Sequence, residues 1–167
     1  IPRQLDIPGH DHKKVMSYIE LIEGRRSAGA KVAIIGAGGI GFDLAELLTH
    51  DSAAKDGLQR FQSEWGIDAT LAARGGLKPA EEETSAREIW LLQRKTTKVG
   101  DGLAKTTGWI RRALLKKRGV HMLSGVHYEK IDDAGLHIIA DGIAHCLPVD
   151  HIVVCAGQEP RRDLEAE

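Results

Sequence analysis

A three-layer α/β fold with a central parallel sheet is the fold class that the sequence predicts. Short apolar runs at residues 31–35, 88–93 and 151–156 have the composition of strands buried on both faces. Between them, residues 40–50 and 103–118 place apolar side chains with the spacing of an amphipathic helix. Because strands that alternate with helices are typical of parallel sheets, the order of these segments indicates βαβ units.

The remaining elements are predicted in chain order. Residues 1–10 have the composition of an extended linker, and Asp11 is expected to cap a helix of about 13 residues. That helix would carry one apolar stripe formed by Val15, Tyr18, Ile19 and Ile22. Residues 51–87 are interpreted as an insertion with a short helix near residues 58–65.

A β-meander is predicted after the second crossover helix. Strands are expected at residues 120–123 and 126–131, and Leu136, Ile138 and Ala140 alternate along the next one. The dipeptide Asp141-Gly142 then predicts a hairpin turn. The sequence therefore predicts an antiparallel meander added to the parallel sheet.

Composition narrows the class of protein. The 167 residues suit one domain, and 42% apolar and 28% charged residues are ordinary for a globular protein. We expect a cytoplasmic protein without membrane contact, because apolar runs of about 18 to 20 residues and a signal-peptide pattern are both missing. Cys146 and Cys155 are nine positions apart, which matches no CxxC pair, so both are expected to be buried as small apolar residues.

The glycine motif is the strongest functional signal. Gly36-Ala37-Gly38-Gly39-Ile40-Gly41 follows an apolar strand and opens a helix, the context that gives a G-x-G-x-x-G pattern its meaning. Gly36 would permit the tight turn, Gly38 would let a pyrophosphate approach the backbone, and Gly41 would bring helix and strand together. Backbone N–H groups from Gly38, Gly39 and Ile40 are predicted to bind that pyrophosphate. The sequence thus predicts a Rossmann-like dinucleotide-binding domain.

The end of the second strand predicts which dinucleotide binds. NAD-binding units carry an Asp or Glu there, which accepts hydrogen bonds from the ribose 2′-hydroxyl. Here Gln93, Arg94 and Lys95 occupy that place. Arg94 offers a planar fork for phosphate and Lys95 a mobile charge, so the pair predicts selection of the 2′-phosphate of NADPH.

Clustered positive charge allows other interpretations. Residues 94–118 hold nine Lys and Arg against one acid, Asp101, which gives +8, while the whole chain at −1 leaves −9 elsewhere. Such clusters also occur in nucleic-acid patches, but the segment carries no recognised nucleic-acid motif. We therefore expect no nucleic-acid partner, and a plain solvated helix face remains an explanation for Lys116, Lys117 and Arg118.

Three further classes fit less well. A short-chain dehydrogenase would need Tyr-x-x-x-Lys, whereas Ile22 and Asp132 follow Tyr18 and Tyr128 at that spacing. A methyltransferase would place an acid where Arg94 stands. His10 and His12 are too few for a zinc site, so no metal site is predicted.

Several stretches together resemble one family. Residues 31–43 (KVAIIGAGGIGFD), 64–68 (EWGID), 92–95 (LQRK), 102–110 (GLAKTTGWI) and 154–160 (VCAGQEP) are similar, in the same order, to the NADPH-binding region of bacterial 2,4-dienoyl-CoA reductase. The resemblance spans nearly the whole chain. It implies a parent flavoprotein oxidoreductase that carries FMN and a 4Fe-4S cluster on a barrel and FAD on a second domain, into which the present domain is inserted.

The resemblance also implies roles for parts of this chain. Residues 1–30 would come from the FAD-binding region, 31–156 would bind NADPH, and 157–167 would return to the FAD domain, so that Gly157 and Gln158 line the flavin junction. Hydride would pass from NADPH to FAD, and Lys98 and Trp109 would contact the acyl-CoA. No catalytic residue is assigned, and this chain alone is expected to be inactive. The alternative is a regulatory domain that senses a nucleotide without redox activity.

Overall fold

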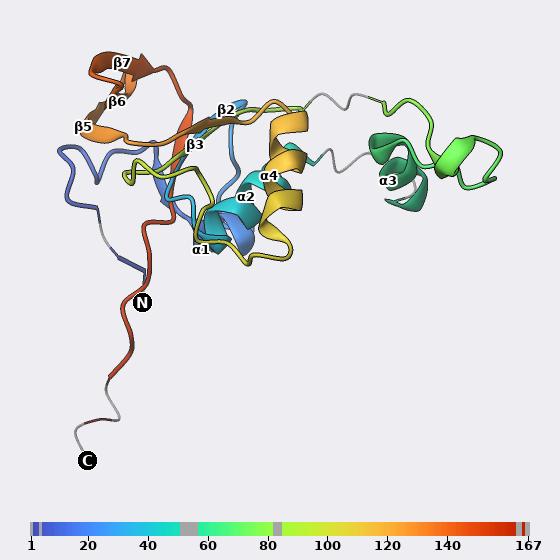
Figure 1. The fold of residues 1–167 in the computed structure, drawn as a ribbon. Coiled ribbons are helices and arrows are strands. Elements are labelled where there is room, and N and C mark those ends of the chain that lie inside the picture. Colours follow the sequence, from blue (N-terminus) through green and yellow to red (C-terminus); the bar gives the residue numbers. More distant parts are fainter. Residues whose placement is uncertain (1, 4, 51–56, 82–84, 163–164, 166–167) are drawn as a thin grey trace.

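The central sheet has the predicted architecture. The computed structural model describes residues 2–3, 5–50, 57–81, 85–162 and 165. Within these residues a five-stranded sheet has the order β1-β8-β2-β3-β4, with every pairing parallel (Figure 1). Its strands are Val15–Ser17 (β1), His151–Val154 (β8), Lys31–Ile35 (β2), Glu88–Leu92 (β3) and His121–Leu123 (β4). The predicted α/β class is therefore confirmed.

Strand β2 lies at the centre and is buried on both faces, as its composition predicts. Val32 and Ile34 belong to the apolar cluster on the helical side of the sheet. Ala33 and Ile35 belong to the cluster on the opposite side. Because successive side chains of a strand point to opposite faces, both layers pack on this one strand.

Helices cover one face of the sheet. They are α1 (Tyr18–Ile22), α2 (Gly39–Thr49) and α4 (Gly108–Lys117), and Figure 1 shows them on one side of the strands. Phe42 and Leu44 of α2 are buried against the sheet. Arg111 of α4 pairs with Asp43 and Glu46 of α2, so the two helices are also joined at their surface.

The antiparallel meander covers the other face. In the described part of the chain it consists of β5 (His127–Asp132), β6 (Gly135–Ala140) and β7 (Ile143–Leu147). Leu136 and Ile138 of β6 are fully buried in the cluster that includes Trp90. Asp141 and Gly142 both have positive φ, 51° and 76°, as a two-residue hairpin turn requires. The predicted meander and its turn are confirmed.

The expected helix from Asp11 is wrong. Residues 15–17 form strand β1, which pairs with β8 at the sheet edge, and the helix that follows has only five residues. Its cap is Ser17, whose hydroxyl accepts from the Glu20 N–H at 3.2 Å while the Glu20 carboxylate accepts from the Ser17 N–H at 2.8 Å. Tyr18 therefore begins the helix, and Val15 pairs with Ile152 instead of extending an apolar stripe.

The inserted segment contains the short helix that the sequence predicts. Helix α3 spans Gly57–Trp65, and a 3-10 turn follows at Arg74–Gly76 (η1), while residues 51–56 and 82–84 lie outside the described residues. The Arg118 side chain, at the end of α4, donates to both carboxylate oxygens of Glu64 at 2.8 and 3.1 Å. Both side chains are 4% exposed, so a buried ion pair joins α3 to the body of the domain.

None of the described helices is long and apolar enough to cross a bilayer.

Candidate nucleotide-binding site

The glycine turn lies directly after β2 and has the geometry that the motif predicts. Gly36 has φ +113°, a region that side chains rarely adopt, and a Cβ added there would stand 2.2 Å from the Cys155 carbonyl oxygen. A Cβ on Gly41 would stand 1.9 Å from the carbonyl oxygen of Gly36. Only glycine fits at these two positions, because the turn contacts the end of β8 at Gly36 and the start of α2 at Gly41.

The middle glycines differ in their surroundings. Among the described residues, apart from the neighbours along the chain and the backbone of α2, no atom lies within 4 Å of a Cβ added to Gly38 or Gly39. Gly38 is the N-cap of α2 and has no side chain to cap the first-turn N–H groups of the helix. The open space and the available donors make this helix start suitable for a phosphate.

The turn after β3 holds the predicted basic pair. The Gln93 side-chain amide donates to the carbonyl oxygens of Lys95 at 3.0 Å and of Thr97 at 2.8 Å. The Gly125 N–H also donates to the Lys95 carbonyl, at 2.9 Å. Arg94 and Lys95 are both exposed on this backbone. The turn is therefore fixed by hydrogen bonds while its two cations stay available to a ligand.

One cavity of about 440 Å³ brings the motif and the basic pair together. It lies beyond the C-terminal ends of the parallel strands β2, β3 and β8. Open α/β sheets bind ligands at such a point. Of the predicted residues, it is lined by Gly36, Gly38, Arg94, Lys95 and Gly157.

Some predicted residues lie beside this cavity without lining it. Gly39, Ile40 and Gly41 form the start of α2, next to the lining residue Gly38. Gln158 instead donates its side-chain amide to the Tyr18 hydroxyl at 2.7 Å. The structure thus brings together the glycines predicted to bind pyrophosphate and the cations predicted to bind the 2′-phosphate, whereas Gln158 faces α1.

Sequence reasoning missed several lining residues, of which Tyr128 is the largest. It lies on β5 next to a register shift of the meander, and burial raises the pKa of its hydroxyl while the nearby Arg94 partly opposes this rise. The side chain is therefore a neutral phenol at physiological pH. Asp101 and Thr97 also line the cavity, and among its described lining residues Asp101 is the single carboxylate against the cations Arg94 and Lys95.

The two cysteines have different surroundings, and both are free thiols. Cys155 is buried as expected and borders the cavity, and burial raises its pKa to about 12, so it stays a protonated thiol. Cys146 is exposed on β7, so the expectation that it is buried is wrong. Its Sγ lies 3.8 Å from His137 Nε2.

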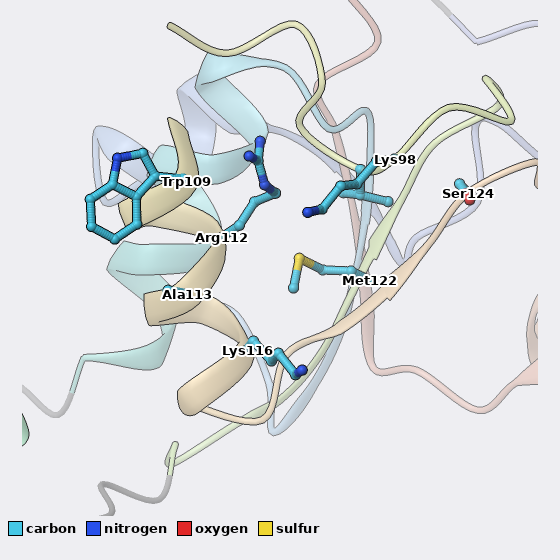
Figure 2. Close-up of a pocket in the computed structure, with 8 residues that line it drawn as sticks. Lys98, Trp109, Arg112, Ala113, Lys116, Met122 and Ser124 are labelled. Atoms are coloured by element: carbon cyan, nitrogen blue, oxygen red, sulfur yellow. The ribbon is translucent and has the colours of Figure 1, made fainter. Parts of the chain in front are cut away.

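Lys98 and Trp109 line a different cavity, of about 470 Å³, between α4 and β4 (Figure 2). The structure therefore brings this predicted pair to one place. Trp109 is 59% exposed and lies at the rim, where its indole N–H donates to the Thr106 carbonyl at 3.1 Å. In Figure 2 the indole points away from the Lys98 side chain.

Comparison with protein families gives a match over the whole chain. The model for pyridine nucleotide-disulphide oxidoreductases matches residues 1–167. The chain belongs to this family. Within it, the glycine turn, helix α2 and the end of β3 described above make up a Rossmann-like nucleotide-binding domain. Among the described residues of the chain, Cys146 and Cys155 form no disulfide.

A curated relative and several solved structures are similar to the chain. A metal reductase from Desulforamulus reducens is 24% identical over 168 residues, which cover 95% of this chain and 23% of that protein. A 2-naphthoyl-CoA reductase in complex with 2-naphthoyl-CoA has a TM-score of 0.70 at 20% identity, over 98% of this chain and 20% of its own. An engineered water-forming NADPH oxidase bound to NADPH has a TM-score of 0.58 at 20% identity, over 98% of this chain and 30% of its own.

A 6-hydroxypseudooxynicotine amine oxidase from Pseudomonas geniculata N1 has a TM-score of 0.65 at 15% identity, over 99% of this chain and 20% of its own. At such identities the structural likeness establishes the fold. The chain spans about a fifth to a third of the length of the proteins it matches here.

Proposed function

We propose that this chain is the NADPH-binding domain of a multidomain flavoprotein oxidoreductase that acts on an unsaturated acyl-CoA, as 2,4-dienoyl-CoA reductase does. One observation carries the proposal: Arg94 and Lys95 line the same cavity as Gly36 and Gly38. NADPH bound there would supply a hydride to FAD on a neighbouring domain. The residues of this chain would bind and orient the dinucleotide.

Each part of the site suits one part of NADPH. Gly38 and Gly39 leave room for the pyrophosphate, which the N–H groups of the first turn of α2 would bind. Arg94 and Lys95 would bind the 2′-phosphate, Arg94 through its planar fork. The neutral Tyr128 hydroxyl, next to Arg94, can donate a hydrogen bond to the same phosphate or ribose.

The proposed domain boundaries receive support from the chain ends. The Arg3 N–H donates to the Gly157 carbonyl at 3.1 Å, and Pro2 forms an isolated antiparallel bridge with Gln158. The chain at Pro2 and Arg3 therefore lies beside the chain at Gly157 and Gln158, as two connections to one FAD-binding domain would. We propose that Gly157 and Gln158 lie at the flavin junction and that FMN and 4Fe-4S are carried by other domains of the parent.

Two similar structures support the ligand classes. The engineered NADPH oxidase carries substitutions that replace an aspartate and introduce two arginines, and its structure contains NADPH. The end of β3 shows the same difference in charge, because it carries Arg94 and Lys95 where NAD-binding units carry an acidic residue. The 2-naphthoyl-CoA reductase complex holds a CoA thioester. We extend the proposal to Lys98 and Trp109 as acyl-CoA contacts, because both border one cavity.

Calorimetric titration of the chain with NADPH and with NADH tests the cofactor assignment. We expect Arg94→Ala to weaken NADPH binding by about 1.5 to 3 kcal/mol, the range for hydrogen bonds to charged groups, and to leave NADH nearly unchanged. Lys105→Ala is the matched control, since it removes a cation from the same basic stretch but lines neither cavity. Equal losses for both dinucleotides would contradict the assignment of Arg94.

A further inference from the structure

Of the five cations in α4 and at its C-cap, three have a partner on the side that faces α2 and α3: Arg111, Lys117 and Arg118. Arg111 pairs with the carboxylates of Asp43 and Glu46. Arg118, directly after the helix, is buried in its ion pair with Glu64. The Lys117 ammonium stands 5.7 Å from the centre of the Trp65 ring. The cations on this side of the helix therefore already have partners within the domain.

The side of α4 that faces β4 is different. Arg112 and Lys116 are four residues apart and so share one helix face. Together with Lys98 they line the cavity of about 470 Å³, whose other lining residues are Val99, Trp109, Ala113, Met122 and Ser124 (Figure 2). No carboxylate is among these lining residues, and among the described residues neither Lys98 nor Lys116 is paired with one.

The walls of this cavity are fixed by packing. Arg112 Nη1 donates to the Gly100 carbonyl at 2.9 Å, which ties the loop after Lys98 to the helix. Gly100 has φ +74°, and a Cβ there would stand 2.6 Å from the Phe42 ring. Val99 is buried in the main core. The loop is therefore held in one position, and the Lys98 backbone with it.

Three cations around one cavity have an energetic cost in the free protein. Like charges at i and i+4 of a helix are destabilising by tenths of a kcal/mol, and Lys98 adds a third positive charge opposite them. An anion between them would remove this repulsion. Arg112 has four further N–H donors besides the one bound to Gly100, and the Ser124 hydroxyl adds another. A planar fork with two ammonium groups is the chemistry that binds phosphate groups.

We propose that this cavity is a second phosphate site, in which Lys98, Arg112 and Lys116 bind the diphosphate of a ligand other than NADPH. We identify this ligand as the CoA part of the acyl-CoA substrate, and that identification rests on the proposed function. The two cavities have no lining residue in common. The indole of Trp109 points away from Lys98, so the cations and not the aromatic ring define the ligand.

The experiment titrates the chain with inorganic pyrophosphate, with coenzyme A and with NADPH. We expect pyrophosphate to bind in the presence of saturating NADPH. Lys98→Gln and Lys116→Gln should each weaken pyrophosphate binding roughly tenfold, the usual effect of losing one charge-assisted contact, and change NADPH affinity less than about twofold. Coenzyme A that binds tighter than pyrophosphate, with the same sensitivity to both variants, identifies the CoA moiety as the source of the diphosphate; equal affinities identify a free diphosphate.

Lys117→Gln is the matched control, because it removes the same charge from the neighbouring position outside the cavity. An equal loss of pyrophosphate affinity in Lys117→Gln, or the absence of pyrophosphate binding, would overturn the second site. Pyrophosphate that competes with NADPH and is weakened by Arg94→Ala would also overturn it. A different result is a chain that binds NADH and NADPH with equal affinity while Lys98→Gln and Lys116→Gln still weaken its pyrophosphate binding. That result would refute the proposed function and leave the second phosphate site supported.

Discussion

At the scale of single residues, the glycine motif contains two different physical requirements. Gly36 and Gly41 are required by the protein itself, since an added Cβ would overlap a backbone carbonyl in each case. Gly38 has open space around it, so its missing side chain benefits a ligand instead. The motif predicts all three positions and this division, and the structure adds the atoms involved, the Cys155 carbonyl oxygen for Gly36 and the Gly36 carbonyl oxygen for Gly41.

This division predicts opposite outcomes for two alanine variants. Gly41→Ala should lower the free energy of unfolding by about 3 kcal/mol, because the methyl group meets the Gly36 carbonyl oxygen and α2 must shift. Gly38→Ala should leave stability within about 0.5 kcal/mol, because its φ of −84° is ordinary, yet reduce NADPH affinity by filling the phosphate space. Urea unfolding and NADPH titration of each variant measure the two effects.

Gly57→Ala serves as the control for both variants, since it adds the same methyl group in open space at a glycine that lines neither cavity. We expect Gly57→Ala to keep both stability and affinity. A Gly38→Ala protein that binds NADPH normally would show that the phosphate does not approach that backbone.

Other residues of the candidate site could not be predicted from spacing. Tyr128 reaches the cavity from the meander, and its place depends on the β-bulge between Tyr128 and Lys130. Cys146 is predicted to be buried because the two cysteines match no CxxC pair, but the structure exposes four of the five residues of β7. Which face of an added strand is buried depends on what covers it, and no local pattern contains that information.

At the scale of elements, the longer strands and helices follow from their apolar periodicity, whereas β1 does not. Val15, Tyr18, Ile19 and Ile22 have helical spacing, yet residues 15–17 gain more by pairing with β8 at the edge of the sheet. A three-residue strand is too short to show its own period. The Ser17 and Glu20 capping box does mark the true helix start, which was the local signal available in the sequence.

The buried ion pair between α3 and the end of α4 gives a prediction at this scale. Glu64→Ala should lower the free energy of unfolding by about 3 to 5 kcal/mol, because it leaves the Arg118 charge buried with Thr49 as its one side-chain partner among the described residues. The double variant Glu64→Leu/Arg118→Met should recover much of that loss, since neither charge then remains buried. Urea unfolding measures all of these stabilities.

Glu46→Ala provides the comparison, because Glu46 belongs to a partly exposed pair with Arg111. Its loss should cost at most about 1 kcal/mol. If Glu64→Ala were no more harmful than Glu46→Ala, the inserted helix would contribute little to the stability of the domain.

At the scale of the whole molecule, the cations of residues 94–118 divide mainly into those held in ion pairs and those that line one of two cavities. Arg111 and Arg118 are in ion pairs with acids from outside the segment. Arg94 and Lys95 face the nucleotide cavity, and Lys98, Arg112 and Lys116 face the second one. The positive charge of residues 94–118 thus predicts that this segment binds anions. Only the fold shows that the cations line two separate cavities and that Arg111 and Arg118 are already paired with carboxylates.

The last prediction concerns hydride transfer in a longer chain that includes the flanking flavoprotein segments. Anaerobic stopped-flow absorbance would follow reduction of FAD by NADPH or NADH. Arg94→Ala should raise the NADPH concentration for half-maximal reduction about 10- to 100-fold and leave the limiting rate nearly unchanged, because the 2′-phosphate is remote from the nicotinamide. The corresponding values for NADH should not move. FAD that NADPH never reduces, in a chain that still binds the dinucleotide, would instead favour a nucleotide-sensing domain, since binding would then have no redox consequence.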